Sequence, residues 1–126
     1  MFKNSVDKEN IAVMYLRLSK EDGEKTESNS ISNQREIINS YVKRNQITMV
    51  KEYVDDGYSG ATFDRPNFKE MMKDAYDKKF DTIIVKDLSR FGRDYIDSGR
   101  YLQKVFPSLD IRFIALNDNY DSYTAS

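Results

Sequence analysis

Hydroxyl and guanidinium side chains occur together in three short segments of this sequence. The segment YLRLS contains Arg17 and Ser19, DGYSGATFDRP contains Ser59 and Arg65, and DLSRFGRD contains Arg90 and Arg93. Arginine suits phosphate because its planar fork donates paired hydrogen bonds and keeps its charge. In phosphoryl transfer, most of the catalytic work is positioning and stabilisation of charge on the non-bridging oxygens. The three segments therefore predict an anion site with a nucleophile in it, and this chemistry does not require a metal.

The residue types that are missing narrow the chemistry further. Cysteine is absent, which excludes disulfides, a thiolate nucleophile and a Cys-ligated metal. Histidine is also absent, which excludes a Ser-His-Asp triad, a Cys-His pair and the usual catalytic zinc site. Hydrolytic or transfer chemistry must then use Ser, Thr, Tyr, Asp, Glu, Lys or Arg. We expect no cofactor and no metal.

Length and charge suggest one cytoplasmic domain that does not hold DNA strongly by itself. The 126 residues fit a single domain with a real core, and neither a membrane-spanning run nor a signal-peptide pattern is present. The formal net charge is −1, from 20 basic and 21 acidic residues. Because domains that hold DNA alone are usually basic, this composition fits a catalytic module whose DNA-binding parts lie elsewhere.

The elements that must position these side chains alternate between strand and helix. Apolar, β-favouring runs predict strands at 11–18, 48–54, 81–85 and 111–116. Helical spacing predicts helices from a Ser30 or Ser32 cap to Asn45, over 67–78, and over 94–106 with a stop at Pro107. Loops are predicted at 19–29 and 55–66, and the end of the chain is predicted to be a polar, turn-like tail. This alternation indicates a three-layer αβα domain of the α/β class with a mostly parallel sheet.

The three reactive segments lie at, or just after, the ends of the first three predicted strands. In open α/β sheets, sites gather where loops leave the carboxyl ends of the strands. We therefore expect all three segments to meet at one edge of the sheet. Taken singly, Arg17 also fits a surface salt bridge, Ser19 fits a cap or loop hydroxyl, and Arg90 and Arg93 fit a solvated helix start. Arginines are unfavourable beside a helix N-terminus, however, which suggests an anionic ligand or nearby carboxylates such as Asp87 and Asp94.

Four motifs in this order resemble those of the resolvase/invertase-type serine recombinases. They are YLRLS, SISNQR, DDGYSGATFDRP and VKDLSRFGRD, and the resemblance runs from Ile11 to Asp121. The residues of these motifs are most similar to those of the large serine recombinases of integrases and mobile elements. The resemblance implies a resolvase-like fold, site-specific recombination of double-stranded DNA, and no cofactor.

The resemblance also implies roles for individual residues. Ser19 matches the nucleophile that forms a 5′-phosphoserine link and frees a 3′-OH. The arginines that match the phosphate-binding positions are Arg17, Arg65, Arg90 and Arg93, and the supporting polar positions are Gln34 and Ser59. In this family, homodimers assemble into homotetramers that cut four strands, rotate and religate.

Two departures from the family pattern limit what is implied. Resolvases have Asp directly before the first arginine of the third motif, whereas this chain has Ser89, so no general acid or base is assigned. Family members also continue into a long dimerisation helix and DNA-binding domains, and this chain ends at Ser126. We expect the 1–126 chain to be a truncated catalytic domain that binds DNA weakly and recombines poorly.

Two other functions fit the same element order. A flavodoxin-like receiver domain would use Asp87 as phosphoacceptor, but it needs an acidic pair where this chain has Arg17 and Ser19. A catalytically inactive interaction domain of the same fold would need neither the serine nor the arginines. Mg²⁺-dependent labelling of Asp87 by acetyl phosphate would indicate the receiver domain, and covalent trapping of DNA on Ser19 distinguishes the recombinase from the inactive domain.

Overall fold

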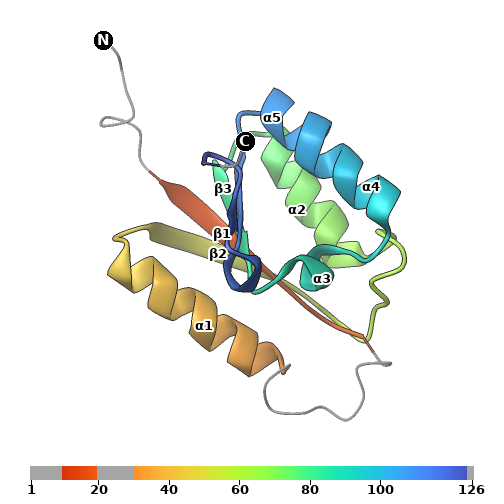
Figure 1. The fold of residues 1–126 in the computed structure, drawn as a ribbon, viewed down its shortest axis with the longest axis horizontal. Helices are drawn as coiled ribbons and strands as arrows, with labels where there is room; N and C mark the ends of the chain where they lie inside the picture. The colour runs from red at the N-terminus through yellow and green to blue at the C-terminus, as the bar shows by residue number, and fades with distance from the viewer. Residues whose placement is uncertain (1–9, 20–29, 125–126) are drawn as a thin grey trace.

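The computed structural model describes residues 10–19 and 30–124, which form a five-stranded sheet with helices on both faces (Figure 1). The strands are β1 (Ile11–Leu18), β2 (Thr48–Asp56), β3 (Thr82–Val85), β4 (Arg112–Ala115) and β5 (Tyr120–Asp121), in the order β2-β1-β3-β4-β5. The first four strands are parallel, and β5 pairs antiparallel with β4. The predicted three-layer α/β fold is confirmed. Of the loop predicted at 19–29, only Ser19 lies within the described residues.

The two faces of the sheet carry separate apolar cores. Helix α1 (Ile31–Arg44) covers one face alone, and its Ile38 and Val42 pack against alternate β1 residues such as Met14. Helices α2 (Pro66–Tyr76), α4 (Tyr95–Arg100) and α5 (Phe106–Ser108) cover the other face. Successive strand residues point to opposite faces, so β1 contributes to both cores and is fully enclosed. Its carboxyl end is thereby held rigidly.

The capping residues of α1 are those that its sequence predicts. Ser30 precedes the helix, and its hydroxyl accepts a hydrogen bond from the backbone N–H of Asn33 at 3.0 Å. Asn45 ends the helix as predicted. Helix α2 is capped differently, because Arg65 at its N-cap makes no side-chain cap bond. The carboxylate of Asp55 on β2 instead accepts from the backbone N–H groups of Asn67 and Phe68.

The last helix does not stop at Pro107, contrary to the prediction. A π-helical turn (Tyr101–Val105) joins α4 to α5, and the backbone N–H of Phe106 bonds to the carbonyl of Tyr101, five residues earlier. Helix α5 begins directly after this turn, so Pro107 lies at one of its first positions. A missing backbone N–H destabilises a helix little there. The helical segment therefore continues to Ser108.

Three short elements were not predicted: one follows β3, and the other two form the tail after β4. Helix α3 (Leu88–Phe91) follows β3 after two residues. The tail, predicted to be turn-like, forms a 3₁₀ turn (Leu116–Asp118) and then β5, where Asp121 accepts a paired hydrogen bond from Arg112. No helix in the described part of the chain is long and apolar enough to cross a bilayer.

Candidate active site

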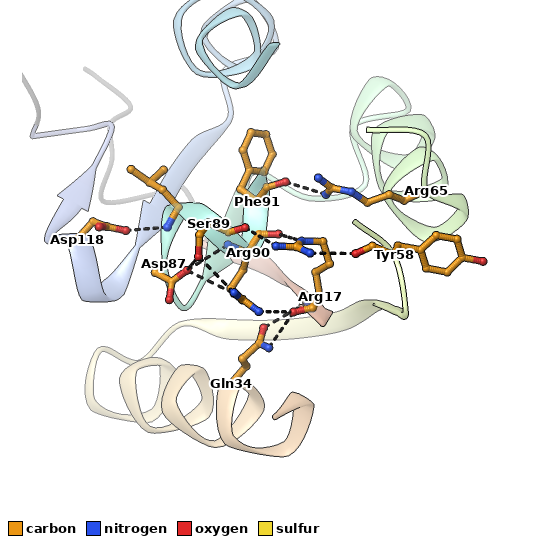
Figure 2. Close-up of polar contacts among 10 residues, drawn as sticks. Arg17, Gln34, Tyr58, Arg65, Asp87, Ser89, Arg90, Phe91 and Asp118 are labelled. Atoms are coloured by element: carbon orange, nitrogen blue, oxygen red, sulfur yellow. Dashed lines mark hydrogen bonds and ion pairs between the residues drawn. The ribbon is translucent and has the colours of Figure 1, made fainter. Parts of the chain in front are cut away.

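The three reactive segments meet at the carboxyl edge of the sheet, as predicted (Figure 2). Arg17, near the end of β1, is the residue that joins them. Its guanidinium donates to the backbone carbonyl of Tyr58 in the loop after β2, at 2.9 Å. It also donates to the carbonyls of Ser89 at 2.6 Å and Arg90 at 3.1 Å, both in α3. Arg17 is 0% exposed, so the surface salt bridge considered for it is wrong.

Gln34 on α1 holds the backbone of β1 two residues before Ser19. Its amide nitrogen donates to the carbonyl of Arg17 at 3.0 Å, and its amide oxygen accepts from the N–H of Arg17 at 3.3 Å. Gln34 is fully buried, and Ser19 is 3% exposed. The position of Ser19 is therefore determined by an enclosed strand and by a side chain from the opposite layer.

Arg65 is fully buried among aromatic rings between the loop after β2 and α3. Its Nε donates to the carbonyl of Thr62 at 2.8 Å, and its Nη1 donates to the carbonyl of Phe91 at 2.7 Å. The guanidinium carbon lies 4.6 Å from the ring centre of Phe63. A guanidinium is weakly hydrated and stacks on aromatic faces, which lowers the cost of burying it.

Arg90 lies between a carboxylate and the backbone of β1. Its Nε is 3.5 Å from Oδ1 of Asp87, and its Nη1 donates to the carbonyl of Arg17 at 3.0 Å. The carboxylate of Asp87 also accepts from the backbone N–H of Arg90 and caps α3. Arg90 is 6% exposed, so its interpretation as part of a solvated helix start is wrong. The nearby carboxylate considered from the sequence is present.

Arg93 and Ser59 lie nearer the surface of the same edge. Arg93 is exposed, and its backbone N–H donates to the carbonyl of Gly60 at 2.7 Å. The hydroxyl of Ser59 accepts from the N–H of Ala61 at 3.0 Å, and its carbonyl accepts from Nε of Arg65 at 3.3 Å. All seven residues predicted for the site therefore lie at one edge.

Comparison with known proteins identifies this arrangement. The family described as Resolvase, N terminal domain, matches residues 12–126. The N-terminal catalytic domain of TP901-1 integrase is 30% identical, with a TM-score of 0.83 over 91% of this chain and 83% of that chain. The chain belongs to the resolvase family. It is the catalytic domain of a serine recombinase, a site-specific enzyme that cleaves and rejoins DNA.

Other solved serine recombinases are also similar. A resolvase family site-specific recombinase from Streptococcus pneumoniae is 27% identical, with a TM-score of 0.76 over 92% of this chain and 78% of that chain. A serine recombinase from Sulfolobus solfataricus is 18% identical, with a TM-score of 0.64 over 83% of this chain and 68% of that chain, and shows the shared fold. The receiver-domain alternative is not supported.

The departure at Ser89 has a structural counterpart in this recombinase. The hydroxyl of Ser89 donates to Oδ1 of Asp87 at 2.6 Å and accepts from Nη2 of Arg90 at 3.4 Å. A serine and a carboxylate two residues earlier together contact Arg90. Sequence reasoning left open whether Asp87 reaches this arginine, and the structure shows that it does.

Sequence reasoning missed two parts of the site. The acceptors for Arg17 and Arg65 are backbone carbonyls, which no residue type reveals. Asp55 was also missed, although it is 1% exposed and contacts β1 and α2, whereas its neighbour Asp56 is exposed. The alternation of side chains along β2 could have indicated that Asp55 is buried, because Tyr53 and Asp55 lie on the same, buried side of that strand.

Replacing Gly60 with alanine is expected to slow cleavage by this recombinase about 10- to 100-fold, because small misplacements of catalytic groups are costly. A Cβ at Gly60 would lie 2.7 Å from Nη2 of Arg17 and 2.9 Å from Nε of Arg93. Arg17 is buried and three hydrogen bonds hold its guanidinium, so it cannot move aside without losing them. Single-turnover cleavage of a suicide DNA substrate measures the effect. The control is Gly99→Ala, whose Cβ would meet nothing within 4 Å. Equal rates for both variants would contradict the prediction.

Proposed function

We propose that Ser19 is the nucleophile of site-specific DNA recombination. Its Oγ attacks the phosphorus of a DNA phosphodiester, the bond from phosphorus to the 3′ oxygen breaks, and that oxygen leaves as a 3′-OH. The 5′-phosphate remains on Ser19, and attack by a 3′-OH in the reverse direction rejoins the strand. The covalent bond conserves the phosphodiester energy, so strand joining needs no nucleotide cofactor. The observation that carries this proposal is the position of Ser19 at the strand end that Gln34 and Arg17 fix.

Four arginines bind the scissile phosphate in this proposal, and they do so in two ways. Arg93 is exposed, so DNA can reach it from solvent. The buried arginines, Arg17, Arg65 and Arg90, donate to backbone carbonyls. A phosphate oxygen is a stronger acceptor for a guanidinium than a neutral carbonyl is, so DNA can replace some of these bonds. Gln34 supports the strand end and Ser59 supports the loop.

The charge of the chain fits a catalytic domain that relies on further contacts. The partner is double-stranded DNA, and a net charge of −1 gives little non-specific attraction to it. We propose that the active form is a homodimer that pairs into a homotetramer, with each subunit supplying one Ser19. The proposed location is the cytoplasm.

The test is to trap the covalent intermediate and to identify its bond. A suicide substrate that carries the recombination site and a nick beside the cleavage point loses its short 3′-OH fragment after cleavage, which prevents religation. We expect protein on the 5′ end of the cut, and a proteolytic peptide that contains Ser19 with an attached 5′-nucleotide by mass spectrometry. Attachment to a 3′ end, or to another residue, would overturn the proposal. The absence of any adduct on a cognate site favours the inactive interaction domain.

A further inference from the structure

A buried chain of three side chains connects β2, β1 and the active-site loop. The hydroxyl of Tyr15 donates to Oδ2 of Asp55 at 2.8 Å and accepts from Nη1 of Arg65 at 3.2 Å. Tyr15 and Arg65 are 0% exposed, and Asp55 is 1% exposed. The tyrosine lies in β1, two residues before Arg17 and four before Ser19. The chain thus joins a buried carboxylate to a proposed phosphate-binding arginine.

The two ends of this hydrogen-bond chain, Asp55 and Arg65, carry opposite charges that compensate each other. Among the described residues, Arg65 makes no direct ion pair with a carboxylate, and its hydrogen bonds are to neutral oxygens. A buried charge without compensation is costly, and hydroxyl-mediated contact with Asp55 supplies the nearest negative partner in its hydrogen-bond network. Burial raises the pKa of the Tyr15 hydroxyl, although the charge of Arg65 opposes this. The hydroxyl therefore keeps its proton and can donate and accept at once.

The same contacts leave one nitrogen of the Arg65 guanidinium without a hydrogen-bond partner among the described residues. Nε and Nη1 are held by carbonyls and by Tyr15, whereas Nη2 has no hydrogen-bond partner in the described part of the chain. An unsatisfied buried donor is uncommon and commonly marks a functional site. Fixing Nη1 fixes Nη2 as well, because the guanidinium is planar.

We propose that Asp55 is a positioning residue for DNA cleavage, which acts through the Tyr15 hydroxyl to hold Arg65 with Nη2 directed to the scissile phosphate. The inference rests on the proposed function of Arg65. A simpler role competes with it, because Asp55 also accepts from the N–H groups of Asn67 and Phe68 and so caps α2. A cap stabilises the helix but has no reason to change the cleavage rate.

Two conservative variants separate positioning from capping. Tyr15→Phe removes the connecting hydroxyl and leaves Asp55 to cap α2. Asp55→Asn removes the charge, while the remaining amide oxygen still accepts from a backbone N–H. We expect each variant to lower the single-turnover cleavage rate about 10- to 100-fold. The DNA concentration for half-saturation should change less than about threefold, because the network orients Arg65 rather than providing DNA affinity. The double variant should cleave at about the rate of the slower single variant, because both substitutions break the same hydrogen-bond chain.

The protein contains a second buried tyrosine–carboxylate pair, which provides a matched control. The hydroxyl of Tyr53 donates to Oδ2 of Asp74 at 2.6 Å, and both residues are at most 4% exposed. No guanidinium takes part in the contacts of this pair. Tyr53→Phe should reduce the unfolding midpoint about as much as Tyr15→Phe does, with an unchanged cleavage rate. If Tyr15→Phe cleaves within twofold of the wild type, or if Tyr53→Phe is equally slow, the positioning role is wrong.

A second measurement separates this inference from the proposed function. The Nε–Hε resonance of Arg65 in ¹⁵N NMR spectra of the 1–126 chain reports the guanidinium without any DNA. Tyr15→Phe should shift this resonance and speed its exchange with water, while Tyr53→Phe should not. If Ser19→Ala still forms the adduct, the proposed function fails whatever Arg65 does. If Ser19→Ala is inactive and the Arg65 resonance is unchanged in Tyr15→Phe, only the positioning inference fails.

Discussion

Replacement of Ser19 with alanine is expected to abolish the covalent DNA adduct and to reduce strand cleavage on the order of 10⁴-fold or more, as loss of the nucleophilic serine does in a serine protease. The reason is chemical as much as positional. The chain has neither cysteine nor histidine, so no thiolate can replace the hydroxyl and no imidazole can activate water in its place. Any cleavage that remains in this variant proceeds without attack by Ser19, so it should leave no protein on the 5′ end of the cut. The measurement is adduct formation on a suicide substrate, followed by gel electrophoresis under denaturing conditions.

Other serines provide the controls for this result. Ser59→Ala should still form the adduct at a lower rate, because its hydroxyl accepts from the backbone N–H of Ala61 within the active-site loop. Ser40→Ala, on the exposed side of α1, should cleave like the wild type. Ser19→Ala should also unfold at nearly the same temperature, since a buried hydroxyl is replaced by a smaller group. An adduct that persists in Ser19→Ala would exclude Ser19 as the nucleophile.

Much of this site was predictable because strand ends in a parallel sheet meet at one edge. The apolar, β-favouring run Ile11–Leu18 predicts a buried strand, and its position places Arg17 and Ser19 at the carboxyl end of that strand. Gln34 was predicted only by resemblance to a family motif, and its contact with the backbone of Arg17 explains why an amide suits that position. An amide both donates and accepts, so it pairs with an N–H and a carbonyl of one residue.

The partners of the arginines could not be predicted from residue types. Arg17 donates to Tyr58, Ser89 and Arg90 through backbone carbonyls, which every residue possesses. Their positions depend on how two loops fold, and loops have the weakest sequence signals. The expectation of an anion site with four arginines therefore did not include this buried environment. Three of the four predicted arginines are buried, and Arg93 is exposed.

This environment has a consequence for how DNA engages the site. A carbonyl compensates a buried guanidinium with hydrogen bonds but not with a negative charge. Arg90 faces the carboxylate of Asp87, whereas the hydrogen bonds of Arg65 are to neutral oxygens, so Arg65 keeps the stronger preference for an anion. Arg17 holds the carbonyl of Tyr58 in the loop after β2, and Arg65 holds the carbonyl of Phe91 in α3. If these arginines bind phosphate as proposed, phosphate binding and the positions of this loop and of α3 are coupled through the same side chains.

The second large effect is expected at Arg17, which connects the loop after β2 and helix α3 to β1. Arg17→Lys should reduce the free energy of unfolding by about 3 kcal/mol, because hydrogen bonds from a charged donor contribute about 1.5–3 kcal/mol each and buried carbonyls would lose their partners. A lysine ammonium is a single point and cannot match a planar fork that reaches Tyr58, Ser89 and Arg90 together. Cleavage should fall about 100-fold or more, as it does when one charge-stabilising donor is lost.

Arg35 provides the matched control for this substitution. It also makes a paired interaction, donating to both carboxylate oxygens of Glu52, but the two side chains are each 38% exposed. Exposed ion pairs contribute about 1 kcal/mol or less, so Arg35→Lys should change the free energy of unfolding little and leave cleavage unchanged. Urea unfolding followed by circular dichroism measures both variants on one scale. If Arg17→Lys is as stable as Arg35→Lys, the carbonyl contacts do not hold the loops. If it is unstable but cleaves normally when folded, Arg17 serves the fold and not the phosphate.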